Sequence, residues 1–130
     1  MKMTVSRYLL DSSAWLSYFF AENNQIKEVI DGENFLFTSV ISLFEIKKKL
    51  IKDKLIEEKI EKFINFIKEK SITLKLDINI CESAAEISIK KGLHAIDSLI
   101  YSTSISNKTK LITGDNDFRN KDNVILFKKK

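Results

Sequence analysis

The chain has 130 residues, of which 44% are hydrophobic and 31% are charged. This length suffices for one sizeable core and is too short for two ordinary domains, so we expect a single domain over residues 1–130, and the even spread of apolar residues excludes disorder. The net charge of +4 favours a polyanionic partner only weakly, because the lysine runs at 47–54 and 128–130 are typical of solvated surface.

The sequence lacks the signals of secretion and of membrane insertion. No stretch approaches the roughly 18 to 20 apolar residues of a membrane-spanning helix, and Asp11 interrupts the N-terminal stretch that could form a signal-peptide core. The single cysteine, Cys81, excludes an internal disulfide, and we expect it to be a small helix-packing residue. With His94 as the one histidine, no zinc site of Cys and His ligands can form. These features predict a protein of the reducing cytoplasm.

The first half of the chain alternates between short apolar segments and helical patterns. Residues 5–10 (VSRYLL) predict a buried strand that runs into an apolar helix, with Asp11, Ser12 and Ser13 as candidate caps. The patterns that follow predict a helix at 23–30, a strand at 34–38, a helix capped by Ser39 and a helix spanning Ile56 to Ile67. The last two helices carry apolar residues every three or four positions, so we expect a hairpin with one solvated side.

The second half continues the alternation. A short β-branched segment at 73–76 predicts an edge strand, and Asp77 caps a helix that Gly92 ends. The remaining predictions are a helix at 93–106, a strand at 110–113 that meets the Gly114–Asp115 turn, and a last strand at 123–127. Because parallel neighbours need crossover helices, this alternation implies a mainly parallel sheet with helices on both faces.

Four acidic residues lie in apolar surroundings. Asp11 follows YLL, Glu45 lies in VISLFEI, Asp97 lies in LHAIDSLIY and Asp115 follows LITG. A buried carboxylate must be protonated, hydrogen-bonded or bound to a metal. In open parallel sheets ligands bind at the carboxyl ends of the strands. The sequence places Asp11 and Asp115 at such ends, and Glu45 can reach the same edge. Whether Asp97 reaches the same edge depends on a topology that periodicity does not reveal.

A shared site would need a cation. Four converging carboxylates raise one another's pKa unless a divalent ion neutralises them, and an all-oxygen site suits Mg²⁺ or Mn²⁺ and phosphodiester hydrolysis with one or two ions. Plainer interpretations stay open for each residue taken alone. Asp11 is equally well a helix cap, Asp115 can belong to ordinary turn chemistry, and Glu45 can lie on a solvated helix face, whereas Asp97 is the hardest to explain otherwise.

The segments LLDSSAWLSYF, SVISLFEIKKKL, GLHAIDSLIYSTSI and KLITGDNDF resemble, in order, the four acidic motifs of the PIN-domain family. The resemblance covers almost the whole chain. It implies a three-layer α/β/α sandwich on a short parallel sheet. It also assigns roles to seven residues: a catalytic and metal-binding quartet of Asp11, Glu45, Asp97 and Asp115, an accessory metal carboxylate at Asp117, and polar supports at Ser13 and Thr113. Tyr101, Ser102 and Thr103 depart from the small alanines frequent in the family.

A bare domain of this kind is most similar to the toxins of VapBC-type toxin–antitoxin pairs. The resemblance implies a metal-dependent endoribonuclease that forms a homodimer and is held inactive by a small antitoxin. A PIN nuclease of RNA maturation or decay, without an antitoxin, is one alternative, and a catalytically silent binding module is another. A phosphatase using Asp115 and Asp117 is a distant one, since such enzymes place that pair after the first strand. The RNA that is cut and the role of 47–54 are left open.

Overall fold

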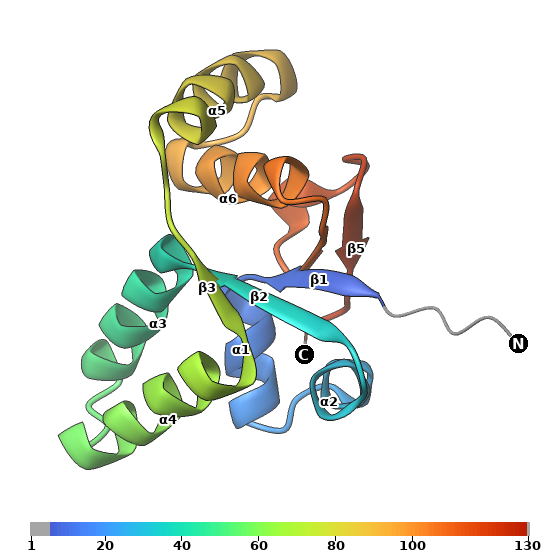
Figure 1. Ribbon diagram of the computed structural model, residues 1–130. Coiled ribbons are helices and arrows are strands. Elements are labelled where there is room, and N and C mark those ends of the chain that lie inside the picture. Colours follow the sequence, from blue (N-terminus) through green and yellow to red (C-terminus); the bar gives the residue numbers. More distant parts are fainter. Residues whose placement is uncertain (1–5, 130) are drawn as a thin grey trace, which may run out of the picture.

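The molecule is built on a five-stranded sheet in which every strand is parallel to its neighbours and the strand order is β3-β2-β1-β4-β5 (Figure 1). The computed structural model describes residues 6–129, so Val5 of the first predicted strand lies outside the described residues. The strands are β1 (Arg7–Leu10), β2 (Phe35–Ser39), β3 (Ile72–Leu74), β4 (Lys110–Thr113) and β5 (Val124–Leu126). The expected mainly parallel sheet is confirmed.

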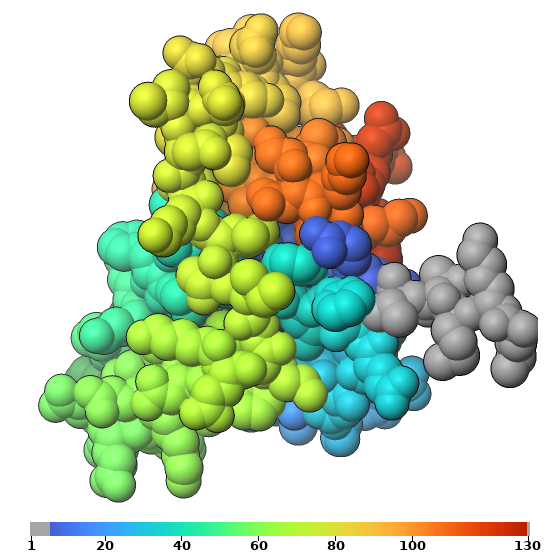
Figure 2. Space-filling view, in the orientation of Figure 1, coloured from blue at the N-terminus to red at the C-terminus, as the bar shows by residue number. Residues whose placement is uncertain are grey.

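Helices cover both faces of this sheet (Figure 1). They are α1 (Ser12–Phe19), α2 (Asn24–Asp31), α3 (Val40–Lys52), α4 (Glu57–Lys70), α5 (Ile78–Lys91) and α6 (Ala95–Ser106), with a short 3-10 turn, η1 (Asn116–Phe118). The helices α1 to α4 lie on one face, and α5 and α6 lie on the other. Figure 2 shows the α3–α4 hairpin and the α5–α6 pair as two lobes on either side of the sheet. Among the described residues, no helix is long and apolar enough to cross a membrane.

Two apolar clusters, one on each face of the sheet, form the core. Neighbouring residues of one strand enter opposite clusters: Leu10 packs with α1 to α4, and Leu9 packs with α6. The same alternation holds for Ile112 and Leu111 in β4. Because side chains alternate along a strand, a strand buried on both faces is apolar at consecutive positions, which explains the runs YLL and LIT. The three-layer α/β/α sandwich is therefore confirmed.

The observed ends of several elements differ from the predicted ones by one to three residues. The edge strand ends at Leu74 rather than at residue 76, because its partner β2 ends at Ser39, which pairs with Leu74 and then caps α3. The helix predicted from residue 93 begins at Ala95, with His94 in the N-cap position. Cys81 is exposed, so the expectation that it packs between helices was wrong.

A chain of buried hydrogen bonds joins the layer of α1 to α4 to the sheet. The indole Nε1 of Trp15, which is fully buried, donates to Thr38 Oγ1 at 3.0 Å. The hydroxyls of Thr38 and Ser71 are 2.7 Å apart, and Ser71 donates to the carbonyl of Ile67 at 2.7 Å. Since Ser71 donates to Ile67, Thr38 donates to Ser71 and accepts from Trp15. This hydroxyl therefore connects α1, β2 and the end of α4.

We expect Thr38→Val to lower the free energy of unfolding by about 1–3 kcal/mol, because it keeps the side-chain shape and leaves the indole N–H of Trp15 buried without an acceptor. Urea unfolding measures the loss. Thr73→Val is the matched control, since Thr73 pairs with Thr38 in the sheet and is only partly buried. Equal losses in the two variants would contradict the role assigned to the hydrogen-bond chain.

Candidate active site

The structure brings the four predicted carboxylates to one cavity at the carboxyl edge of the sheet. Asp11 directly follows β1, and Asp115 lies just beyond β4, after Gly114. Glu45 comes from α3, which begins where β2 ends, and Asp97 comes from the first turn of α6. All four line a cavity of about 420 Å³. The open question about Asp97 is thereby answered: α6 leads into the amino end of β4, so its first turn lies at the opposite, carboxyl edge.

Asp11 is 5% exposed and is held by three donors. Its Oδ1 accepts from the N–H of Ala14 at 3.0 Å and from the hydroxyl of Ser13 at 2.6 Å, and its Oδ2 accepts from the hydroxyl of Thr113. Burial raises the pKa of Asp11, and the two hydroxyls and the amide oppose that shift. The helix-cap interpretation of Asp11 was correct, and the same carboxylate also lines the cavity.

Ser13 and Thr113 join the start of α1 to the turn after β4. Ser13 Oγ accepts from the N–H of Gly114 at 2.9 Å, and Thr113 Oγ1 accepts from the N–H of Asp115 at 3.0 Å. Each hydroxyl thus donates to Asp11 and accepts from a backbone amide next to the other carboxylates. Because each hydroxyl uses both its donor and its acceptor position, the two side chains fix the position of Asp11 relative to Asp115. This geometry fits the supporting role that the resemblance implies.

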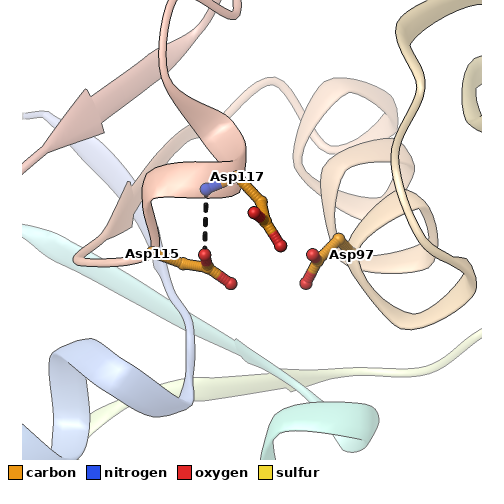
Figure 3. Close-up of side chains that lie close together, drawn as sticks. All are labelled: Asp97, Asp115 and Asp117. Atoms are coloured by element: carbon orange, nitrogen blue, oxygen red, sulfur yellow. Dashed lines mark hydrogen bonds between the residues drawn. The ribbon is translucent and has the colours of Figure 1, made fainter.

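Asp97, Asp115 and Asp117 form the tightest acidic group. Each offers a carboxylate oxygen, and these three oxygens lie within 4.8 Å of one another. Figure 3 shows the carboxylate of Asp97 pointing from α6 toward the other two. Asp115 Oδ1 also accepts from the N–H of Asp117 at 2.9 Å, which is the ordinary turn chemistry considered for this residue (Figure 3).

The environment raises the pKa of Asp97 to about 6. Desolvation is the main cause, and the charges of Asp115 and Asp117 come next, followed by those of Glu45 and Asp11. Partial burial and the neighbouring carboxylates likewise raise the pKa of Glu45, while Ser12 lowers it by donating to Oε1 at 3.3 Å. A divalent cation among these groups would relieve the repulsion that raises both pKa values.

The donor set fits Mg²⁺ or Mn²⁺. It consists of carboxylate oxygens, which these hard ions prefer. Asp97, Asp115 and Asp117 are close enough to share an ion, whereas Asp11 and Glu45 line the same cavity outside that tight group. The resemblance makes Asp117 only an accessory residue, yet its carboxylate belongs to the same tight group as those of Asp97 and Asp115.

Sequence reasoning did not place Ser12 or Lys129 in the cavity wall. Ser12 was considered only as a helix cap, yet it contacts Glu45, which is 33 residues away. Lys129 belongs to a lysine run that was interpreted as solvated surface, yet it lines the cavity, as does Lys49 from the 47–54 run, whose role the sequence left open. The adjacency of Ser12 to Asp11 was a usable signal. Nothing in the pattern of the lysine runs distinguishes these two lysines from their neighbours.

In metal-free protein we expect Asp97→Asn to raise stability at neutral pH. The pKa of Asp97 is about 6 when folded and 3.8 ordinarily, so the folded state binds the proton more tightly and stability falls as pH rises through this window. Removing the charge should add on the order of 1 kcal/mol above pH 6, after allowance for screening at this partly exposed site. The gain should vanish below about pH 4.

Urea unfolding in EDTA at acidic and neutral pH measures this difference. Asp122→Asn, which removes an exposed carboxylate outside the cavity, is the control. An Asp97→Asn protein that is less stable than the parent at pH 7.5 would refute the raised pKa assigned to Asp97.

Several solved structures share this fold. A toxin–antitoxin complex from Klebsiella pneumoniae contains a chain with a TM-score of 0.76 and 18% identity, and the match covers 93% of this chain and 98% of that one. For the Rickettsia felis VapBC2 structure, bound to a promoter DNA fragment, the TM-score is 0.73 and the identity is 20%, and the match covers 95% of this chain and 99% of that one. For Mycobacterium tuberculosis VapC20, described as a sarcin–ricin loop cleaving toxin, the TM-score is 0.68 and the identity is 14%, and the match covers 85% of this chain and 92% of that one. At such identities the likeness shows the fold alone.

By sequence, no functionally curated protein is similar enough to match this chain. The profile of the PIN domain family does match, over residues 8–124. That span contains β2, β3 and β4, most of β1 and the first residue of β5, and every carboxylate of the quartet, together with Asp117. The chain therefore belongs to the PIN domain family.

Proposed function

We propose that this protein is a metal-dependent endoribonuclease and the toxin of a VapBC-type toxin–antitoxin pair. The observation that carries the proposal is the convergence of Asp97, Asp115 and Asp117, with Asp11 and Glu45 lining the same cavity. Membership of the PIN domain family implies nuclease chemistry. RNA is favoured as the substrate because a structural neighbour is described as cleaving the sarcin–ricin loop.

In this proposal the chain's own residues bind and orient an Mg²⁺ or Mn²⁺ ion. Asp97, Asp115 and Asp117 hold it, and Asp11 and Glu45 complete the acidic wall. Such an ion lowers the pKa of bound water and stabilises the charge that develops on phosphoryl oxygens during in-line displacement. Ser13 and Thr113 orient Asp11 and oppose the rise in its pKa that burial causes, because each donates a hydrogen bond to its carboxylate.

A protein partner is supported by an apolar groove between α3 and α4. The groove, of about 510 Å³, exposes Phe44 and Ile51, and Lys47, Lys48 and Lys68 lie at its rim. Exposed apolar surface with a polar rim is typical of a protein interface, and the lysines favour acidic residues in the partner. An antitoxin fits this description, and two structural neighbours are toxin–antitoxin complexes. The homodimer implied by resemblance stays a prediction that light scattering of the purified protein can test.

Purified protein freed of any bound partner is expected to cleave a labelled structured RNA with Mn²⁺ and to lose this activity in EDTA. Asp97→Asn should lower kcat/KM by at least about 100-fold, because a metal ion supplies several kcal/mol of transition-state stabilisation. Asp122→Asn, which lies outside the cavity, should keep full activity. Cleavage that survives in Asp97→Asn would indicate a contaminating nuclease, and no cleavage with either Mn²⁺ or Mg²⁺ would favour the binding-module alternative.

Thr113→Val and Ser13→Ala should each weaken Mn²⁺ binding by about 10–100-fold. Each variant removes a hydroxyl donor from Asp11, so the pKa of that buried carboxylate rises further and protons compete better with the metal. Calorimetric titration with Mn²⁺ measures the affinity. Ser106→Ala, at the exposed end of α6, should bind Mn²⁺ like the parent. Unchanged affinity in both Thr113→Val and Ser13→Ala would show that metal binding does not depend on Asp11.

A further inference from the structure

The segment after β5 is fixed against the turn that carries Asp115. The buried Phe127 donates its N–H to the carbonyl of Thr113 at 2.9 Å, which extends the pairing of β4 and β5 by one residue. The carbonyl of Lys128 then accepts from Asn23 Nδ2 at 3.1 Å. Lys129, the next residue, lines the cavity of the carboxylates. A lysine run that looks solvated in the sequence is therefore held by two backbone anchors.

The methylene stem of Lys129 lies directly on Gly114, the residue before Asp115. A Cβ atom at position 114 would lie only 2.5 Å from Cγ and 2.6 Å from Cδ of Lys129, and 2.8 Å from Cε2 of Phe127. A residue with a side chain at 114 would thus have to displace both the lysine stem and the buried ring. The absence of a Cβ at Gly114 gives Lys129 its place beside Asp115.

Lys129 is one of two lysines in a cavity wall that is rich in carboxylates. The cavity is lined by six carboxylates, Asp11, Glu22, Glu45, Asp53, Asp97 and Asp115, and by two lysines, Lys49 and Lys129. The ammonium of Lys49 is 3.4 Å from Asp53 Oδ1. Within residues 6–129, Lys129 forms no ion pair, and it is exposed. Its charge is free to meet an anion from solvent.

An RNA strand that enters this cavity would meet more negative charge than one divalent ion neutralises. A lysine ammonium at the rim offsets this repulsion for one phosphate and contributes to binding by releasing a counterion. We propose that Lys129 binds a phosphate of the RNA strand on the Asp115 side of the cavity, as a substrate-positioning residue and not as a metal ligand. This inference rests on the proposed ribonuclease function.

The test uses the full chain carrying Asp97→Asn, so that bound RNA is not cleaved. Lys129→Met is added because methionine keeps an unbranched stem over Gly114 and removes the charge. Lys110→Met is the matched control, since Lys110 is an exposed lysine at the amino end of β4, the opposite edge of the sheet. Fluorescence anisotropy of a labelled single-stranded oligoribonucleotide, titrated with NaCl, gives the affinity and its salt dependence.

With Lys129→Met we expect the slope of log Kobs against log [NaCl] to shrink by about 0.7, and the affinity near 0.1 M salt to fall roughly fivefold. Lys129→Arg should restore both quantities, and Lys110→Met should leave both at the parent's values. With Asp97 intact, Lys129→Met should raise KM more than it lowers kcat, because it removes a contact made before the chemical step.

Three results would overturn the inference. In the first, the Asp97→Asn protein binds RNA and the protein with Asp97 intact cleaves it, but adding Lys129→Met leaves the salt slope of binding unchanged. Only the role of Lys129 then fails. If Lys129→Met tightens Mn²⁺ binding in the absence of RNA and leaves RNA affinity unchanged, the lysine is a stand-in cation for the metal. If the parent neither binds nor cleaves RNA, the proposed function fails and the inference fails with it.

Discussion

The buried carboxylate of Asp11 is the constraint around which the site is arranged. A carboxylate with 5% exposure needs compensation, and this chain supplies it from two elements: the start of α1 and the end of β4. Ser13 and Thr113 each donate to Asp11 and accept from the Gly114–Asp115 backbone, so satisfying Asp11 also positions Asp115. The contact between the start of α1 and the turn after β4 therefore depends on the same hydrogen bonds as the geometry of the site.

Electrostatic cost is distributed unevenly over the cavity. Burial raises the pKa of Asp11, but three donors and the start of α1 oppose that shift, whereas Asp97 in the first turn of α6 accepts no hydrogen bond from the described residues, and its pKa rises to about 6. Helix N-termini favour both carboxylates, yet desolvation, followed by repulsion from Asp115 and Asp117, prevails at Asp97. A cavity whose carboxylates are buried and repel one another is well suited to binding a cation. The same charges that destabilise the metal-free protein would therefore hold the metal ion.

The plain and the functional interpretations of the acidic residues turned out to be compatible. Asp11 caps α1 and Asp115 caps η1, as ordinary helix and turn chemistry predicts, and each still lines the cavity. A carboxylate has two oxygens with several acceptor positions, so one oxygen can fix the local backbone while the other faces a ligand. Cap residues at the carboxyl edge of a parallel sheet are for this reason good candidates for site residues.

The sequence by itself determined the parallel α/β architecture, because short apolar runs such as YLL and LIT alternate with helical patterns along the chain, and it determined the four candidate carboxylates from their apolar neighbours. Only the tertiary structure decided that Asp97 reaches Asp115, that Ser12 meets Glu45 and that Lys129 rests on Gly114. Periodicity reports which face of an element is buried but carries no information on which distant element covers it. Contacts across 18, 33 and 15 residues are set by topology and packing, and a lysine run looks the same whether its members reach solvent or a cavity.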